Sequence, residues 1–198
     1  MRSAIRLSAL LCIVAAAGGS AGAATYRSPD GSIVLEAAQI SYSPGKVTGS
    51  GKVHVTSTDK AAGTNLEADA SKIVVTFASP LSGKRGLGVG LIKEAQLAGP
   101  VRLVYAANQP GGVRTATTAT CDGATFSGAQ QLAHLDGNVR IVHDDPSLFD
   151  QPAVMTGDKA TVNLKSVLGP DEVRFRIESS PGASRIELTP KPKAAETK

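Results

Sequence analysis

Apolar and polar residues alternate with a period of two along most of the chain. Two short patterns produce this alternation, and they follow each other in a fixed order. The first is an acidic residue with small or apolar residues at every second position after it, and its copies begin at Glu36, Asp69, Asp122 and Asp158. The second is glycine followed by apolar residues at every second position. Its three clear copies begin at Gly51, Gly99 and Gly137, and a degenerate fourth runs from Asp171 to Ile177.

This periodicity predicts β-strands. Successive side chains of a strand point to opposite faces, so apolar residues two apart share one face. The residues between them are mostly polar, which is typical of antiparallel strands with one buried face. A helix would need apolar residues at steps of three and four, and only 91–97 leaves that choice open.

Turn dipeptides separate the strand-like runs. They are Pro44-Gly45, Pro110-Gly111, Gly169-Pro170 and Pro181-Gly182. With about five or six residues in each strand, the chain would form roughly ten to sixteen strands in hairpin order. We expect the repeated glycine to allow a bend or bulge where each new strand begins. Such a chain needs two facing sheets or one rolled sheet to bury its apolar face.

The termini differ in composition from the repeats between them. Residues 1–23 resemble a cleavable signal peptide, with Arg2 and Arg6, a short apolar run, and an Ala21-Gly22-Ala23 cleavage site. An uncleaved membrane anchor is the alternative. We expect one domain over 24–190, with a mobile Gly-rich loop at 82–90, and a disordered Lys/Pro tail over 191–198.

Charge and composition exclude several functions. Of 21 basic residues, 19 remain after residue 23 against 17 acidic ones, and no basic run interleaves with aromatic residues. Nucleic-acid binding is therefore not expected. The chain has two cysteines, too few for a disulfide scaffold or a four-cysteine zinc site. Cys121 is expected to be a buried thiol.

No catalytic, metal or cofactor motif is recognisable. The glycines of 86–90 lack the spacing and the helix of a phosphate loop. His54, His134 and His143 are scattered without zinc-ligand spacing, and Asp144-Asp145 precede a proline as turn residues do. There is no nucleophile elbow. We therefore expect a protein without catalysis and without a cofactor.

Four segments together resemble the OstA-like (LptA) family of periplasmic lipopolysaccharide-transport proteins. They are Val47–Val55, Leu66–Val75, Leu135–Ile141 and Met155–Val162, within a resemblance that covers 33–177. It implies a twisted, partly open, taco-like β-jellyroll whose inner face holds lipid acyl chains. It also implies a periplasmic protein that carries lipopolysaccharide from the inner to the outer membrane. The expected partners are further copies, joined head to tail by strand pairing, and related proteins at both membranes.

The resemblance places lipid contacts at Ile33, Leu35, Leu103 and Phe126. Together with the inward apolar residues of the repeats, the predicted groove residues are Ile33, Leu35, Val53, Val55, Ile73, Val101, Leu103, Phe126, Val139, Ile141, Val162 and Phe175. Four arginines at polar positions, which are Arg102, Arg140, Arg174 and Arg176, either meet lipid phosphates or form a solvated face.

Two other interpretations stay open. One is a component of the same pathway that resembles LptC and is anchored at the inner membrane by an uncleaved first segment. The other is a secreted structural β-domain, in which the same inward side chains fill a closed core.

Overall fold

The structure, a computed structural model, describes residues 23–28, 31–60, 63–78, 92–108, 112–165 and 171–191. The predicted signal peptide, apart from its last residue, the Gly-rich loop and the tail beyond residue 191 lie outside these residues. The described residues form eleven strands: β1 (Ala24–Arg27), β2 (Ile33–Ala37), β3 (Gln39–Ser43), β4 (Lys46–Asp59), β5 (Thr64–Phe77), β6 (Ile92–Asn108), β7 (Arg114–Ser127), β8 (Leu132–Asp144), β9 (Phe149–Asn163), β10 (Phe175–Glu178) and β11 (Arg185–Pro190).

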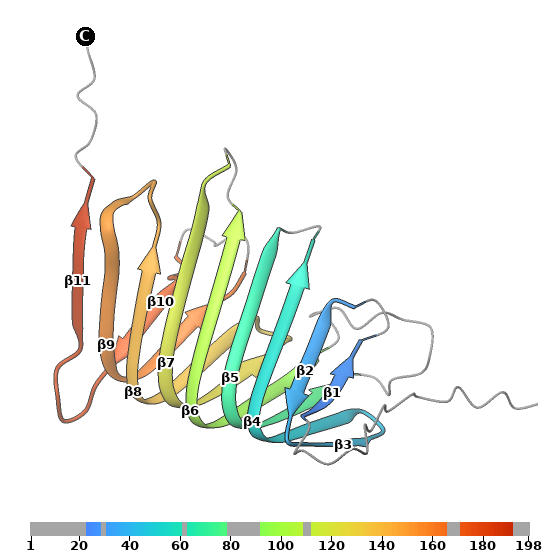
Figure 1. The fold of residues 1–198 in the computed structure, drawn as a ribbon. Helices are drawn as coiled ribbons and strands as arrows, with labels where there is room; N and C mark the ends of the chain where they lie inside the picture. The colour runs from blue at the N-terminus through green and yellow to red at the C-terminus, as the bar shows by residue number, and fades with distance from the viewer. Residues whose placement is uncertain are drawn as a thin grey trace, which may run out of the picture.

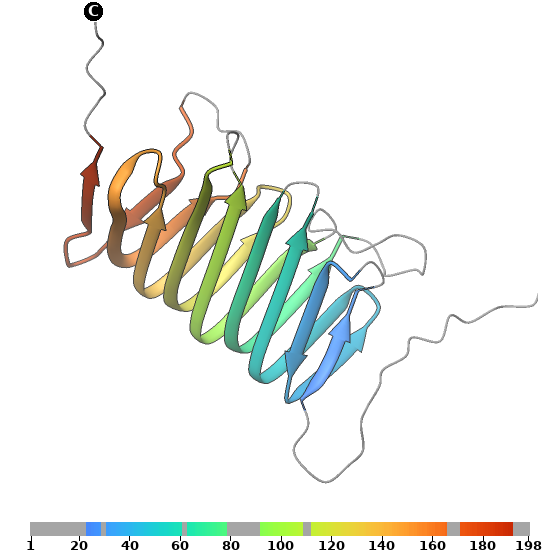
Figure 2. The same cartoon turned by 45° about the horizontal axis from the view of Figure 1, so that its top comes forward.

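All eleven strands belong to one antiparallel sheet. The neighbours along it are β1-β2-β4-β5-β6-β7-β8-β9-β10, while β3 also pairs with β4 and β11 also pairs with β9. From β4 to β9 each strand therefore lies beside its neighbour in sequence, as Figures 1 and 2 show. The predicted all-β class with antiparallel hairpins is confirmed, and 92–97 belongs to a strand.

The six strands from β4 to β9 are long, at 13 to 17 residues, and each is interrupted near its middle. On β4, β6 and β8 two adjacent residues lie opposite a single residue of the following strand. The extra pairs are Gly51-Lys52, Gly99-Pro100 and Gly137-Asn138, opposite Ser71, Asp122 and Asp158. We call this row of bulges the fold line, because bulges bend a strand and increase its twist.

Glycine is required at the fold line by backbone conformation. Gly51, Gly99 and Gly137 have φ of 74°, 89° and 76°, a region that L-residues with a Cβ rarely enter. The sequence prediction of a bend at these glycines is confirmed, but the prediction that new strands begin there is wrong. Because a bulge bends a strand without ending its pairing, each repeated pattern describes roughly half of a long strand.

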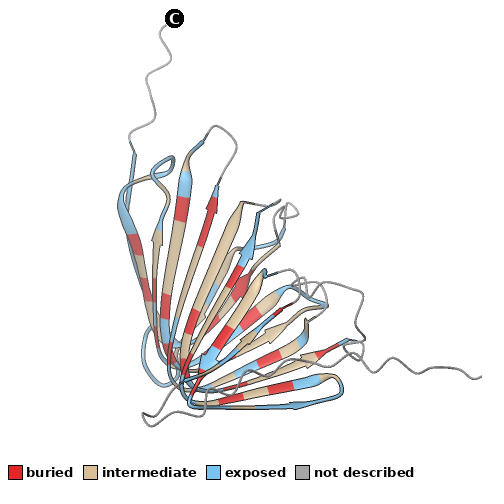
Figure 3. Ribbon diagram, turned by 45° about the vertical axis from the view of Figure 1, so that its right-hand side comes forward, coloured by how far each residue is buried: buried red, intermediate tan, exposed pale blue. Residues whose placement is uncertain are grey.

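Bending at the fold line divides the sheet into two walls that face each other. The β3–β10 wall contains β3, the half-strands 46–50, 72–77, 92–98, 123–127, 132–136 and 159–163, and β10. The β1–β11 wall contains β1, β2, the half-strands 53–59, 64–70, 101–108, 114–121, 139–144 and 149–157, and β11. Figure 3 shows the strands diverging from the line where they bend. The expected open, folded jellyroll is therefore present as one sheet rather than two.

Core residues lie beside the fold line and farther along both walls, as the buried segments in Figure 3 show. Toward the C-terminal strands they include Val101, Leu135, Val139 and Ile141, none more than 2% exposed. A second cluster lies nearer the N-terminal strands and includes Leu35, Val47 and Val53. Apolar burial at this depth is the main stabilising contribution to such a sheet.

Candidate binding groove

The walls enclose an apolar groove of about 510 Å³. Its lining comes from the inward faces of both walls: Tyr26, Ile33, Leu35, Val47, Val55, Ser57, Asp59, Thr64, Leu66, Ala68, Ile73, Val75, Phe77, Ile92, Leu97, Leu103, Tyr105, Phe126, Gly128, Gln131 and Leu164. The polar members come mostly from the strand ends, such as Asp59 and Thr64 of the β4–β5 hairpin and Gln131 between β7 and β8. An apolar interior with a polar margin is suited to an amphiphilic ligand.

Half of the predicted groove residues line this space. Ile33, Leu35 and Leu103 do so from the β1–β11 wall, together with Val55. Ile73 and Phe126 do so from the β3–β10 wall. The groove therefore brings together inward residues from β2, β4, β5, β6 and β7.

The other six predicted residues lie in the core and do not line the groove, whereas Leu35 and Ile73 do both. Val53 is 2% exposed and belongs to the cluster near the N-terminal strands. Val101, Val139, Ile141 and Val162 are at most 8% exposed in the other cluster, against which Phe175 packs. Val53, Val101 and Val139 are buried instead of lining the groove because they lie next to the fold line. Each follows a bulge directly, where the opposite wall is too near to leave space.

Sequence reasoning missed several lining residues. Phe77, Ile92 and Leu97 were not among the predicted ones, although they lie on the β3–β10 wall, and neither were Leu66 and Leu164. Phe77 continues the alternation of Ile73, and Leu97 that of Leu103, so parity along those strands would have found both. Leu66 and Ile92 have the opposite parity to Ile73 and Leu103, because register shifts at the fold line and beside Phe77 reverse the alternation.

A row of polar side chains continues the inner face of the β1–β11 wall toward its C-terminal strands. Tyr105, Thr117 and His143 lie directly opposite one another on β6, β7 and β8. Their positions alternate in step with the buried Val101, Ala119 and Ile141, so they face the other wall. Thr117 Oγ1 and His143 Nδ1 are 2.9 Å apart and share a hydrogen bond.

His143 also connects the walls. Its ring centroid lies 5.2 Å from that of Phe175 on β10. Burial lowers the pKa of His143, and the charge of Arg174 lowers it further, while Asp145 and Asp144 oppose the shift. Burial raises the pKa of Tyr105, against the effect of Arg174. Both groups are therefore uncharged near neutral pH.

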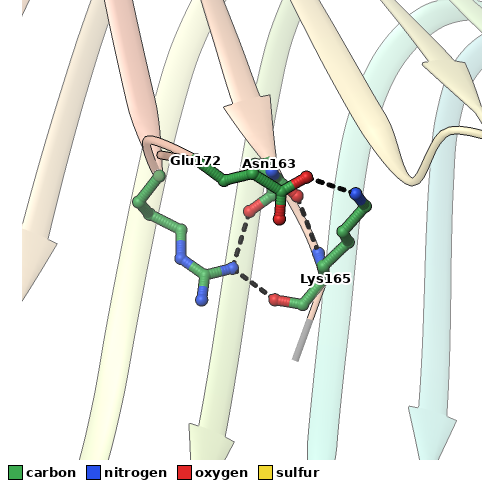
Figure 4. A network of polar contacts seen from close by, with 4 residues as sticks. Asn163, Lys165 and Glu172 are labelled. Carbon is green, nitrogen blue, oxygen red and sulfur yellow. Dashed lines mark hydrogen bonds and ion pairs between the residues drawn. The ribbon is translucent and has the colours of Figure 1, made fainter. Parts of the chain in front are cut away.

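Arg174 is held at the edge of the groove by backbone carbonyls. Its Nη1 donates to Asn163 O at 2.7 Å and to Lys165 O at 2.6 Å. These two residues flank Leu164, which lines the groove. Figure 4 shows the network, in which Lys165 Nζ also pairs with Glu172 and Lys165 N donates to Asn163 Oδ1 at 3.1 Å.

The other three arginines of the phosphate hypothesis occupy outward positions. Arg102 lies 3.6 Å from Asp69, which also accepts a 2.7 Å hydrogen bond from His54 Nδ1 when that nitrogen is protonated. Arg140 and Arg176 are exposed on β8 and β10. These positions are those of a solvated outer face.

The described residues contain no group of three or more His, Cys, Asp or Glu side chains arranged to hold a metal ion. Cys121 is 5% exposed, and burial raises the pKa of its thiol to about 11. The thiol is therefore protonated and unreactive at neutral pH. Within the same described ranges, no helix is long and apolar enough to cross a membrane.

The architecture is thus a folded, partly open β-jellyroll with an apolar groove between its walls. Among solved structures the chain is similar to LptH of Pseudomonas aeruginosa, described as the LptA-homologous periplasmic component of the conserved lipopolysaccharide transport device. The identity is 14% and the TM-score 0.49, over 81% of this chain and 95% of LptH. No protein-family model and no curated protein matches the sequence.

Proposed function

We propose that the protein is a non-catalytic lipid carrier, which holds the acyl chains of lipopolysaccharide in the groove and carries them across the periplasm. The observation that carries this proposal is the open space between the walls. Inward residues such as Leu103 and Phe126 line it instead of filling it. A closed-core structural domain would bring these side chains into contact across the walls.

Apolar contact alone is sufficient to retain hydrocarbon. Burial of each CH₂ contributes about 0.8 kcal/mol, so a stretch of about ten methylene groups contributes about 8 kcal/mol before entropic costs. The volume of about 510 Å³ is within the range of ordinary ligand sites. No reacting group is needed for this role. The choice of lipopolysaccharide as the bound lipid rests on the four segments that resemble the OstA-like family.

The ends of the sheet support a head-to-tail bridge. At one end β1 and β3 are edge strands, and at the other end β10 and β11 are. Every residue of β11 is exposed, with Ile186 and Leu188 more than half so. Exposed edges are templates for strand pairing, and a head-to-tail contact that does not close produces a filament. We propose that copies, and related proteins at the two membranes, join in this way.

Site-specific photo-crosslinking tests the groove. A photoreactive phenylalanine analogue at Leu103 or Phe126 is expected to label bound lipopolysaccharide. The matched controls are Val104 and Thr125, which are adjacent on the same strands, have the opposite parity and are not among the groove-lining residues. Labelling at the control positions equal to that at the inward ones, or no labelling at either, would contradict the proposed carrier.

N-terminal sequencing of the exported protein tests the location. A mature chain that begins near Ala24 is expected for a periplasmic carrier released from the membrane. Retention of residues 1–23 would instead favour the anchored component of the same pathway.

A further inference from the structure

Arg174 holds a positive charge in a fixed place beside the groove. One guanidinium nitrogen donates to both Asn163 O and Lys165 O, and Asn163 N returns a 2.9 Å hydrogen bond to Arg174 O. These contacts fix the backbone and the side chain together. The guanidinium therefore need not lose much further freedom when it meets a ligand.

No described carboxylate forms an ion pair with Arg174. Glu172, two residues before Arg174, pairs with Lys165. Asp145, which together with Arg174 affects the pKa of His143, accepts from Ser147 N at 2.9 Å. The guanidinium of Arg174 donates hydrogen bonds to the described residues only from its Nη1 atom. Its Nε and Nη2 donors are thus available to an anion.

Hydroxyl groups of the opposite wall lie near the start of β10. The ring centroid of Phe175, the residue after Arg174, lies 5.2 Å from that of His143, and His143 shares a hydrogen bond with Thr117. Tyr105 lines the groove, and Thr117 is its direct neighbour on β7. Arg174 acts on the pKa values of both Tyr105 and His143, so its charge lies near this row. A guanidinium near hydroxyl groups is suited to a phosphate, which offers several acceptor oxygens.

We infer that Arg174, together with Tyr105 and Thr117, forms a binding site for the phosphate ester head group of an amphiphile whose hydrocarbon lies in the groove. This inference rests on the proposed function, because the hydrocarbon occupies the same groove. The site binds the anion at the C-terminal end of the groove, where the apolar lining gives way to the polar row. It therefore sets the direction in which the amphiphile enters.

Two detergents with the same tail provide the test. Dodecyl phosphate, dodecyl maltoside and inorganic phosphate are titrated calorimetrically, below the critical micelle concentrations, into the mature chain. Arg174→Gln is expected to weaken dodecyl phosphate binding about tenfold, as the loss of a charge-assisted hydrogen bond implies. Dodecyl maltoside binding should change less than about twofold, since its head group is uncharged.

Arg176→Gln is the matched control. It removes the same charge two residues away, at an exposed outward position of β10, and should leave both affinities within about twofold. Tyr105→Phe removes only a hydroxyl, keeps the fold, and should weaken dodecyl phosphate about threefold without affecting the maltoside. This second variant decides the question even if Arg174→Gln does not fold.

Three other outcomes would contradict the head-group site, and one of them would also contradict the proposed carrier function. If neither detergent binds the wild-type protein, the proposed carrier function and the head-group site both fail. If both detergents bind and neither Arg174→Gln nor Tyr105→Phe alters the preference for phosphate, the head-group site fails while the carrier function stands. Inorganic phosphate binding as tightly as dodecyl phosphate would show a free-anion site and overturn the assignment to a lipid.

Discussion

Substitution of Gly99 by alanine tests the physical role of the repeated glycine. Gly99 has a φ of 89°. A Cβ at this position would lie 2.3 Å from Ser71 Oγ and 2.6 Å from Ser71 Cβ. The hydroxyl can rotate away, but the Ser71 Cβ is fixed to its backbone. Alanine therefore forces β5 and β6 apart at the fold line.

Three contributions determine the expected change in the free energy of unfolding. The left-handed backbone region costs an alanine about 1–2 kcal/mol. The reduced entropy of the unfolded chain offsets about 0.4–1 kcal/mol of that cost. Overpacking against Ser71 adds about 1–3 kcal/mol. We expect Gly99→Ala to lower the free energy of unfolding by about 3 kcal/mol.

Gly45 supplies the control, because its φ is 81° and no atom lies within 4 Å of an added Cβ. Gly45→Ala should cost only about 1 kcal/mol, from the backbone alone. Ser71→Gly removes the obstructing atoms, so the double variant with Gly99→Ala should recover about 2 kcal/mol.

Urea unfolding followed by far-ultraviolet circular dichroism measures all four variants. Equal losses for Gly99→Ala and Gly45→Ala, with no recovery in the double variant, would refute a role for close packing at the fold line.

Two further predictions concern pH. The folded protein holds the Cys121 proton up to a pKa of about 11, against 9.0 for a free thiol, so the unfolded state releases it first and stability falls between these values. Relative to Cys121→Ala, the wild type should lose up to about 3 kcal/mol as pH rises through this window; a constant difference in urea unfolding would count against it. Burial lowers the pKa of His143 below 6.5, so the unfolded state takes up a proton first as the solution is acidified. The wild type should therefore lose stability below pH 6.5 relative to His143→Gln, and parallel pH profiles would exclude the effect.

Local chemistry accounts for the strands and for the bend. The alternation of Val53 with Val55, or Val101 with Leu103, determines which side chains face inward, because side chains alternate along a strand. The repeated glycine indicates a bulge, because few other residues adopt a positive φ. These features are properties of neighbouring residues, so the alternation and the repeated glycine were sufficient to predict them. The continuation of each strand across its bulge was not predicted, because it depends on pairing with the neighbouring strands.

The difference between core and groove depends on the opposite wall. Val101 and Leu103 are two residues apart with the same parity, but Val101 is buried beside the bulge and Leu103 lines the groove. From the alternation in the sequence, Arg174 was expected at a polar position together with Arg102, Arg140 and Arg176. The alternation does not apply to it, since β10 begins only at Phe175 and backbone carbonyls hold its guanidinium beside Leu164.

The sequence by itself determined the strands, their inward faces and the glycine positions at which they bend. Only the tertiary structure decided how far apart the two walls lie at each point, and therefore which inward residues touch one another and which line a space. The physical reason is that wall separation depends on distance from the fold line and on side chains contributed by strands that are not neighbours in the sheet, such as Leu35 of β2 and Ile73 of β5. No local pattern encodes that separation.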